Sequence, residues 1–404
     1  MNNRRAAVAM FCILLFSYVI NAMDRQLFSV LASDVRKALE LTVPQTGLAS
    51  TVFTLGMGLA GLPTGYLLGK MTRKNVVLIG ILIFSAATCL TAYARNLDQL
   101  LAYRFVSGLG EAMQLTALLA IATTYFSRHQ ALAASSLNFT FGLGAIIGPN
   151  LGAALLGSMG WQFPFLAFGW SGVLAMVLIV LLVKPWLTET QALDQQTQLA
   201  GEEQLPTTLM ARTPLLLAMA TVFAGLSIYG YLGLYPTYLR EALGFAPKDA
   251  ALAISMYGLG ALVSLLGGWL GDRYDYRKLL GLALCGAAGI GALLFSNEQA
   301  WLALHALLSF LFGASISGIA YANLSAGIIR SVRRSCAARA SGLFVAALYI
   351  PAAFSGYLLG LLKVSLGWDM AGLLQISGCA LLAALLALLA RTPSKLKTQA
   401  LEGE

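Results

Sequence analysis

Charged residues are scarce in this sequence. Only 11% of its 404 residues are Asp, Glu, Lys or Arg, against about 25% in soluble domains. Long polar stretches are also rare, and residues 187–212 form the one such stretch between apolar segments. These shortages exclude a water-soluble globular chain. With 58% hydrophobic residues and a mean hydropathy of +0.77, the composition predicts a membrane protein.

Cysteine is infrequent as well, with five residues in the chain. Four of them lie in apolar stretches, and no spacing indicates a metal site or a disulfide framework. The nucleotide-binding pattern Gly-x-x-x-x-Gly-Lys-Ser/Thr is absent, and no nucleophile or metal cluster indicates a membrane enzyme. A membrane sensor would be expected to carry an added soluble domain, and the sequence does not indicate one, so we do not expect a sensor. We therefore expect neither an enzyme nor a cofactor, and we expect a proton gradient to supply the energy.

The formal net charge of +9 could indicate a nucleic-acid partner. The charges, however, lie between apolar segments, as topology determinants do, so we expect a lipid bilayer and no nucleic acid. Arg4 and Arg5 followed by an apolar run are similar to a signal peptide. Because the run continues too far and lacks a cleavage site, it predicts a retained first helix.

Twelve apolar segments reach about 20 residues, the length that spans a bilayer. Most of the 26 Lys and Arg residues fall in alternate connections, which predicts cytoplasmic N- and C-termini. The predicted spans cover residues 6–33, 47–69, 75–94, 99–124, 131–157, 163–186, 213–239, 249–270, 278–296, 300–329, 340–362 and 368–390.

The two halves of the chain resemble each other. GYLLGKMTRKN follows the second span and GWLGDRYDYRK follows the eighth, and a Gly-Trp pair precedes both the sixth and the twelfth. An internal repeat in a multi-span chain predicts two bundles with a site between them. We therefore predict an all-α membrane protein with a six-helix bundle at 1–186, a cytoplasmic linker at 187–212, a second six-helix bundle at 213–390 and a cytoplasmic tail at 391–404.

Four charges lie inside the predicted spans, away from the span ends: Asp24 and Arg25 in the first span, and Arg104 and Glu111 in the fourth. Placing a charged side chain in a bilayer costs about 3 kcal/mol, so such residues are expected only where they form ion pairs or have a function. Buried carboxyl groups can carry protons, and the guanidinium fork binds carboxylates, so we interpret Asp24 and Glu111 as proton-coupling groups. The alternative is a set of ion pairs that only fixes helix packing.

Uncharged polar residues in the spans are candidates for substrate binding, since such groups line midplane sites. For the tyrosines, packing or anchoring at the membrane interface is the alternative role. For His305, which lies near the outer end of the tenth span, we expect a packing role rather than a role in the site. The predicted substrate-binding set is Asn21, Arg25, Arg104, Gln114, Asn138, Tyr229, Tyr235, Tyr321, Asn323 and Tyr349.

The repeated basic motif resembles the Gly-x-Leu-x-Asp-Arg-x-Gly-Arg-Lys loop of the major facilitator superfamily, and the resemblance covers essentially the whole chain. Gly69 stands where the family has Asp in the first copy, whereas the second copy retains Asp272. The resemblance implies transport by alternating access in a multi-pass protein, a monomer in the bacterial inner membrane. It also implies gating or structural roles for Gly65, Arg73, Lys74, Gly148, Pro149, Gly268, Asp272 and Arg273.

Within the superfamily, Asn-x-x-Asp-Arg in the first span and Arg-x-x-x-Gly-x-x-Glu in the fourth resemble the anion:cation symporter branch. That branch implies symport of protons with a small organic anion such as a sugar acid, with Arg25 binding the anion. Two alternatives remain open. The Gly148-Pro149 motif is similar to that of proton-driven exporters of drugs or metabolites, and Gly110-Glu111-Ala112 is similar to spinster-like lipid or lysolipid carriers.

Overall fold

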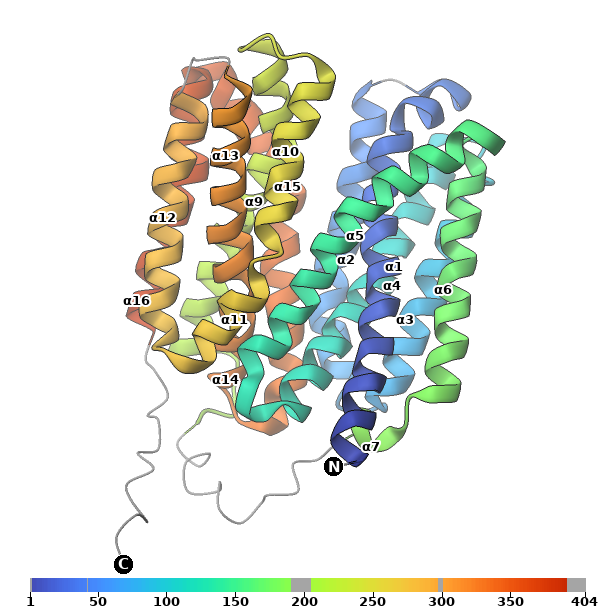
Figure 1. Ribbon diagram of the computed structural model, residues 1–404, viewed down its shortest axis with the longest axis vertical. Coiled ribbons are helices and arrows are strands. Elements are labelled where there is room, and N and C mark those ends of the chain that lie inside the picture. The colour runs from blue at the N-terminus through green and yellow to red at the C-terminus, as the bar shows by residue number, and fades with distance from the viewer. Residues whose placement is uncertain (1, 42, 190–204, 297–300, 391–404) are drawn as a thin grey trace, which may run out of the picture.

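The structure is a computed structural model that describes residues 2–41, 43–189, 205–296 and 301–390 (Figure 1). Within these ranges the chain is helical almost throughout, and no strand occurs. Where water is absent, backbone groups must find partners within their own segment, which explains why the apolar runs fold as helices. The prediction of an all-α membrane fold is confirmed.

The helices of the first half are α1 (Asn2–Ala38), α2 (Val43–Leu67), α3 (Arg73–Thr91), α4 (Leu97–Tyr125), η1 (Ser127–His129), α5 (Gln130–Met159), α6 (Gln162–Leu182) and α7 (Pro185–Thr188). Those of the second half are α9 (Arg212–Glu241), α10 (Pro247–Ala261), α11 (Ser264–Arg273), α12 (Tyr276–Ser296), α13 (Leu302–Phe312), the π-helix η2 (Gly313–Tyr321), α14 (Ala322–Arg330), η3 (Arg334–Cys336), α15 (Ala337–Ala371), the π-helix η4 (Gly372–Gly378) and α16 (Cys379–Leu389).

Among the described residues, ten segments are long and apolar enough to cross a membrane. One of them, Arg334–Leu389, contains two helices that meet at Gly367, and the apolar part of α2 is the shorter segment Val52–Leu67. The number of twelve spans and the cytoplasmic placement of the termini stay predictions.

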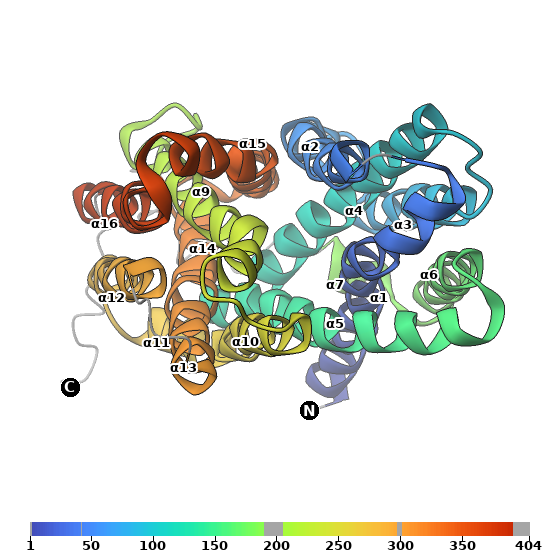
Figure 2. The same ribbon diagram turned by 90° about the horizontal axis from the view of Figure 1, so that it is seen from above.

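The helices form two groups, with α1–α7 on one side and α9–α16 on the other (Figures 1 and 2). Between the groups, α2 packs against α15 and α5 packs against α11. Helix α1 begins and α16 ends at the same end of the molecule. Most of the predicted linker (190–204) and the whole predicted tail (391–404) lie outside the described residues.

The predicted repeat has a backbone counterpart at two glycines. Gly160 precedes α6 and Gly367 precedes the last part of α15, and each has a φ of +82°. Side chains disfavour this left-handed region, whereas glycine adopts it without steric cost. The two Gly-Trp pairs in the sequence therefore mark the same sharp turn in each half.

A second equivalence lies at the basic motif. Lys74 donates its ammonium group to the carbonyls of Val180 and Val183 at the end of α6, at 3.1 and 2.6 Å. In the other half Arg277 donates to the carbonyl of Leu388 at the end of α16, at 3.0 Å. A cation beside carbonyls at a helix C-terminus satisfies them and complements the helix dipole.

The sixth span ends earlier than predicted. The sequence predicts it to continue to residue 186, but α6 ends at Leu182 and Pro185 begins the short α7. Lys184 has an extended backbone because the ring of Pro185 disfavours a helical residue before it.

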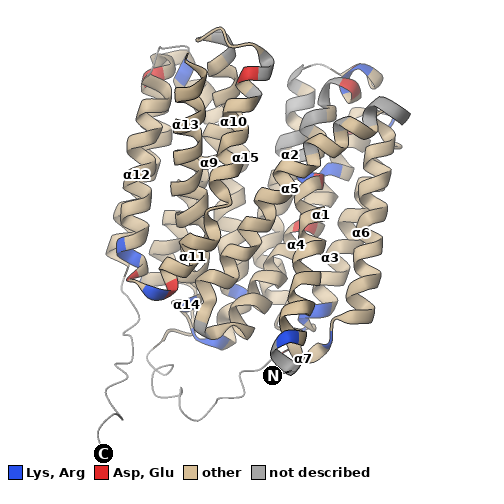
Figure 3. Cartoon of the chain, viewed as in Figure 1, with Lys and Arg blue, Asp and Glu red and all other residues tan. Residues whose placement is uncertain are grey.

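Most Lys and Arg residues lie toward the ends of the helices, and few charged residues lie in the middle of the molecule (Figure 3).

Candidate functional site

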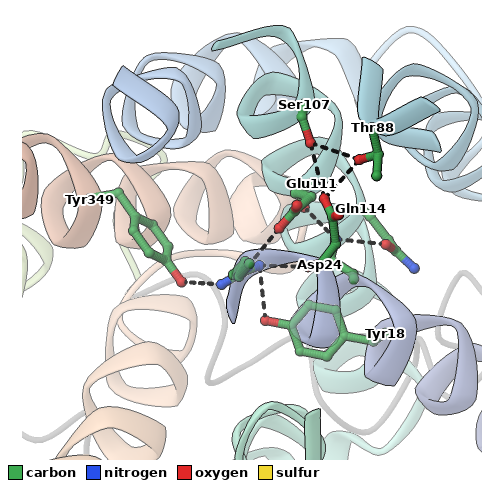
Figure 4. A network of polar contacts seen from close by, with 9 residues as sticks. Tyr18, Asp24, Thr88, Ser107, Glu111, Gln114 and Tyr349 are labelled. Atoms are coloured by element: carbon green, nitrogen blue, oxygen red, sulfur yellow. Dashed lines mark hydrogen bonds and ion pairs between the residues drawn. The ribbon is translucent and has the colours of Figure 1, made fainter. Parts of the chain in front are cut away.

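Arg25 of α1 is the centre of a buried polar cluster. Figure 4 shows the cluster with Tyr18, Glu111 and Tyr349 labelled. Its Nε donates to Glu111 Oε2 on α4 at 2.7 Å, forming an ion pair whose side chains are 5% and 0% exposed. One terminal nitrogen donates to the hydroxyl of Tyr349 on α15 at 2.7 Å. The other donates to Asn21 Oδ1 at 2.9 Å and to the hydroxyl of Tyr18 at 3.4 Å. The guanidinium therefore bonds side chains of both halves at once.

The side chain of Asn21 accepts from Arg25 through its oxygen and donates through its nitrogen to a second set of residues. Its Nδ2 donates to Gln114 Oε1 at 2.8 Å, and Gln114 donates in turn to the hydroxyl of Ser17 at 2.9 Å. All three residues are buried. This row fixes Asn21 with its amide oxygen available to Arg25, so the orientation of the guanidinium is set by the first half of the chain.

Asp24 faces the interior of the first half. Its Oδ2 accepts hydrogen bonds from Thr88 on α3 at 2.8 Å and from Ser107 on α4 at 3.3 Å. The residue is completely buried. Asp24 and Arg25 are adjacent in sequence, but the aspartate is bound by hydroxyl groups and the arginine pairs with Glu111 instead.

The two carboxyl groups each have one unsatisfied oxygen. Asp24 Oδ1 and Glu111 Oε1 are buried and accept no hydrogen bond from a donor among the described residues. The two groups also lie close enough to interact electrostatically. Carboxylate oxygens only accept, so a bond between these groups requires one of them to carry a proton.

Aromatic rings surround the guanidinium of Arg25. Its central carbon lies 5.6 Å from the ring centroids of Tyr18, Phe141 and Tyr349. The ring of Tyr229 on α9 lies 5.9 Å from that of Tyr349, and the hydroxyl groups of Tyr229 and Tyr321 lie within the electrostatic influence of Arg25. We call these five residues the aromatic shell. Their ring faces favour a nearby cation.

Helix α5 reaches this site through glycines. A Cβ atom at Gly144 would collide with Ala22, and one at Gly148 would lie 2.8 Å from the Cα of Met23. Both glycines therefore allow α5 to lie directly against the segment of α1 that carries Asp24 and Arg25. The predicted structural role of Gly148 has this physical basis, and Pro149 lies in α5 without a described side-chain environment.

Arg104 is buried close enough to Asp24 and Glu111 to interact with them electrostatically, but the ion pair of Glu111 is with Arg25. Its guanidinium lies 4.7 Å from the ring centroid of Phe28 and 4.4 Å from that of Phe53. Its Nε has no hydrogen-bond acceptor among the described residues. The structure thus places Arg104 between two rings rather than in an ion pair with Glu111, and its predicted contact with substrate stays a prediction.

Two predicted substrate-binding amides bond to the backbone of the second half. Asn138 donates to the carbonyl of Ser317 at 2.7 Å, which joins α5 to η2. Asn323 donates to the carbonyls of Gly267 and Ile319, at 2.9 and 2.8 Å. These amide N–H groups hold helices together in this conformation.

Tyr235 belongs to a separate buried network. Its hydroxyl shares a hydrogen bond of 2.7 Å with Nδ1 of His305, and its ring stacks on Tyr231 with centroids 4.7 Å apart. Tyr231 donates to Ser309 at 2.8 Å. The structure thus places Tyr235 beside Tyr231 and His305, whereas the hydrogen-bond partners of Arg25 are other residues.

The second copy of the basic motif contacts the first half. Asp272 accepts hydrogen bonds from the backbone N–H groups of Ala131 and Leu132 at the start of α5, at 3.0 and 2.9 Å. It also forms an ion pair with Arg330, which donates to Gln130 at 2.9 Å. A carboxylate suits a helix N-terminus because the N–H groups there are unpaired.

The other gating candidates lie at the same level. Gly65 faces the backbone of Ala338 and Arg339 of α15, and a Cβ atom there would lie 2.9 Å from a carbonyl oxygen. A Cβ at Gly268 would collide with α5. The exposed Arg273 lies over the ring of Trp269. The N–H groups of Arg73 and Lys74 donate to the carboxylate of Glu189, each at 3.0 Å.

Sequence reasoning missed several residues of the site: Ser17, Tyr18, Thr88, Ser107 and Phe141. Helical spacing could have identified two of them. Tyr18 lies seven residues before Arg25, and Ser107 lies four before Glu111, so each shares a face with its partner. Nothing in the local sequence distinguishes Thr88 or Phe141 from packing residues.

A helical membrane fold with a buried ion pair at the junction of two helix groups defines the class of secondary transporters. The family profile described as Major Facilitator Superfamily matches residues 14–356 and 217–404, and the chain belongs to this family. The predicted membership is confirmed, and the family and relatives are transporters rather than enzymes, as expected.

Two curated bacterial relatives are similar to the chain. The 4-hydroxybenzoate transporter of Pseudomonas putida is 27% identical over 305 residues, covering 65% of this chain and 66% of the relative. The probable L-galactonate transporter of Escherichia coli K12 is 25% identical over 282 residues, covering 67% and 62%. The chain thus spans just under two thirds of the length of these relatives.

A solved structure has the same fold. The proton:xylose symporter bound to 6-bromo-6-deoxy-D-glucose superposes with a TM-score of 0.75 over 95% of each chain. The sequence identity is 14%, so this likeness concerns the fold alone.

Proposed function

We propose that this chain is a proton-coupled transporter of a small organic anion, working by alternating access in the bacterial inner membrane. The observation that carries the proposal is the bond from Arg25 to Glu111 within a cluster that also includes Tyr349. The names of the two relatives, which specify 4-hydroxybenzoate and L-galactonate, support an organic anion.

Anion binding and proton binding are linked through Arg25. Its nitrogens bond Glu111, Tyr349, Asn21 and Tyr18, so a bidentate anion must displace at least one of them. Protonation of Glu111 removes its charge and releases Nε, which favours the anion. By the reciprocity of linkage, the anion favours the proton on Glu111 to the same extent. Positive coupling of this sign is the basis of symport.

Asp24 supplies the second proton-binding group. Its unsatisfied Oδ1 and the unsatisfied Glu111 Oε1 allow the pair to hold one proton between them. Two like charges in a buried site disfavour double ionisation. When the anion takes Arg25 away from Glu111, the pair holds its proton more firmly, and it releases the proton when the anion leaves.

The test uses full-length protein in liposomes that contain a pH-sensitive dye. Addition of an organic acid outside, with the membrane potential clamped, is expected to acidify the lumen faster than in protein-free liposomes. The acids tested are 4-hydroxybenzoate and galactonate, the substrates named for the two relatives. Alkalinisation on substrate addition would replace symport by antiport and favour the exporter alternative. Carriage of either anion without any pH change would overturn the proton coupling.

A further inference from the structure

The surroundings of Arg25 assign the anion to a narrower chemical class. We propose that the substrate is an aromatic carboxylate, a flat ring with its acid group on Arg25, rather than a sugar acid. This inference rests on the proposed anion transport and names the substrate class for the same site.

The first line of evidence is the aromatic shell. The ring centroids of Tyr18, Phe141 and Tyr349 all lie 5.6 Å from the guanidinium carbon of Arg25, so a carboxylate that binds Arg25 approaches these rings. The rings come from α1, α5 and α15, so they approach the guanidinium from both halves of the molecule. Rings bind other rings through offset or edge-to-face contacts, beyond the effect of buried area.

The second line of evidence is the state of the amides. A sugar acid has several hydroxyl groups, and each buried hydroxyl needs a hydrogen-bond partner. The amide N–H groups that could supply donors are bonded within the protein. Gln114 donates to Ser17, Asn138 to the carbonyl of Ser317, and Asn323 to the carbonyls of Gly267 and Ile319. A polyol hydroxyl that accepts a hydrogen bond from one of these amides would have to break such a bond, whereas an aromatic ring would not.

The remaining polar groups of the shell fit a ring with few substituents. On the side of the second half they are the phenol groups of Tyr229, Tyr321 and Tyr349. Phenols both donate and accept, so they suit a single hydroxyl or similar group on the ring. One acid group, a flat ring and few hydrogen-bonding groups together describe a benzoate-like anion.

The test compares four acids by titration calorimetry of the purified full-length protein: benzoate, 4-hydroxybenzoate, cyclohexanecarboxylate and galactonate. Cyclohexanecarboxylate matches benzoate in charge and size but lacks the aromatic face. We expect benzoate to bind about three- to tenfold more tightly than cyclohexanecarboxylate, the factor that aromatic pairs contribute. Equal binding of these two acids, or tighter binding of galactonate, would overturn the inference.

Variants of Phe141 separate ring contact from general damage. Phe141→Leu removes one of the rings and is expected to reduce the preference for benzoate over cyclohexanecarboxylate, while Phe141→Tyr keeps the preference. An undiminished preference in Phe141→Leu would remove this ring from the site and count against the inference.

The outcomes for the two proposals are distinguishable. If galactonate binds and drives proton uptake while aromatic acids do neither, the proposed symport stands and the aromatic assignment fails. If benzoate binds with the ring preference but carries no protons, the assignment stands and the coupling fails.

Discussion

Arg25 of α1 and Tyr349 of α15 lie 324 positions apart in the chain and share a hydrogen bond of 2.7 Å. This bond joins the two helix groups at the centre of the candidate site. It also occupies a guanidinium N–H that an anion would need. The same contact therefore stabilises this conformation and competes with substrate.

Replacement of this tyrosine by phenylalanine tests the bridge. Tyr349→Phe keeps the ring but removes the hydroxyl, and a hydrogen bond to a charged group contributes about 1.5–3 kcal/mol. We expect a lower melting temperature of the ligand-free protein, measured by thermal unfolding in detergent. Tyr357→Phe is the matched control, since Tyr357 lies on the same helix and is 72% exposed. Equal melting of both variants would show that the bridge contributes nothing.

Glu111→Gln tests the proton site. Glutamine imitates the neutral, protonated form, so the variant loses the step in which a proton binds and leaves. We expect loss of proton-driven accumulation while exchange of internal for external anion continues, measured by uptake and counterflow in liposomes. Glu189→Gln, which alters a carboxylate at the start of α3, is expected to keep proton-driven uptake. Accumulation at the wild-type level by Glu111→Gln would exclude this residue as the coupling group.

Much of this site could be predicted from the sequence because burial of charge is expensive. Asp24, Arg25 and Glu111 interrupt apolar segments, so each needed a partner or a role, and the structure brings them together. The fold was predictable for a similar reason, since apolar runs of bilayer length have few alternatives to a helix. The repeated Gly-Trp pairs indicated equivalent points in the two halves, and the structure has a left-handed glycine at both, Gly160 and Gly367.

The pairing of the charges could not be predicted. Arg25 contacts Glu111 rather than its neighbour Asp24, and Arg104 lies between Phe28 and Phe53 instead of beside Glu111. These choices depend on how α1, α2 and α4 rotate against one another. Helical spacing gives the face of one helix but not its angle to the next. Polar residues such as Asn138 and Asn323 look like site residues in sequence even where the fold uses them between helices.

Arg25→Lys tests the guanidinium fork. Lysine keeps the charge, but one ammonium group cannot reproduce the planar geometry that serves Glu111, Tyr349 and Asn21 together. Loss of one charge-assisted bond corresponds to an anion affinity about 10- to 100-fold weaker, measured by calorimetry. Arg36→Lys, in the last turn of the same helix, is the control and is expected to bind normally. Unchanged affinity in Arg25→Lys would place the anion elsewhere.

Gly144→Ala tests the close approach of α5 to α1. The added methyl would collide with Ala22, so the helices must separate next to Asp24 and Arg25. Overpacking of this kind costs about 1–3 kcal/mol, and we expect both a lower melting temperature and weaker anion binding. Gly356→Ala is the control, because a Cβ atom there would meet nothing within 4 Å. A normal anion affinity in Gly144→Ala would show that the site does not depend on this helix contact.

Asp272→Asn tests the contact between the halves at the basic motif. The variant keeps an acceptor for Ala131 N–H but loses the charge that complements the start of α5 and pairs with Arg330. Because Gly69 replaces the acid in the first copy of the motif, that copy has no carboxylate at this position to compensate. We expect the halves to separate more often at this end.

A cysteine at the buried Ser135, which packs against α11, reports that separation. In a background where the five native cysteines are serine, Ser135→Cys is expected to react with a maleimide faster when Asp272→Asn is also present. Equal reaction rates with and without Asp272→Asn would show that the hydrogen bonds of Asp272 do not hold the halves together. The contact between the halves would then depend on the packing of α2 with α15 and of α5 with α11.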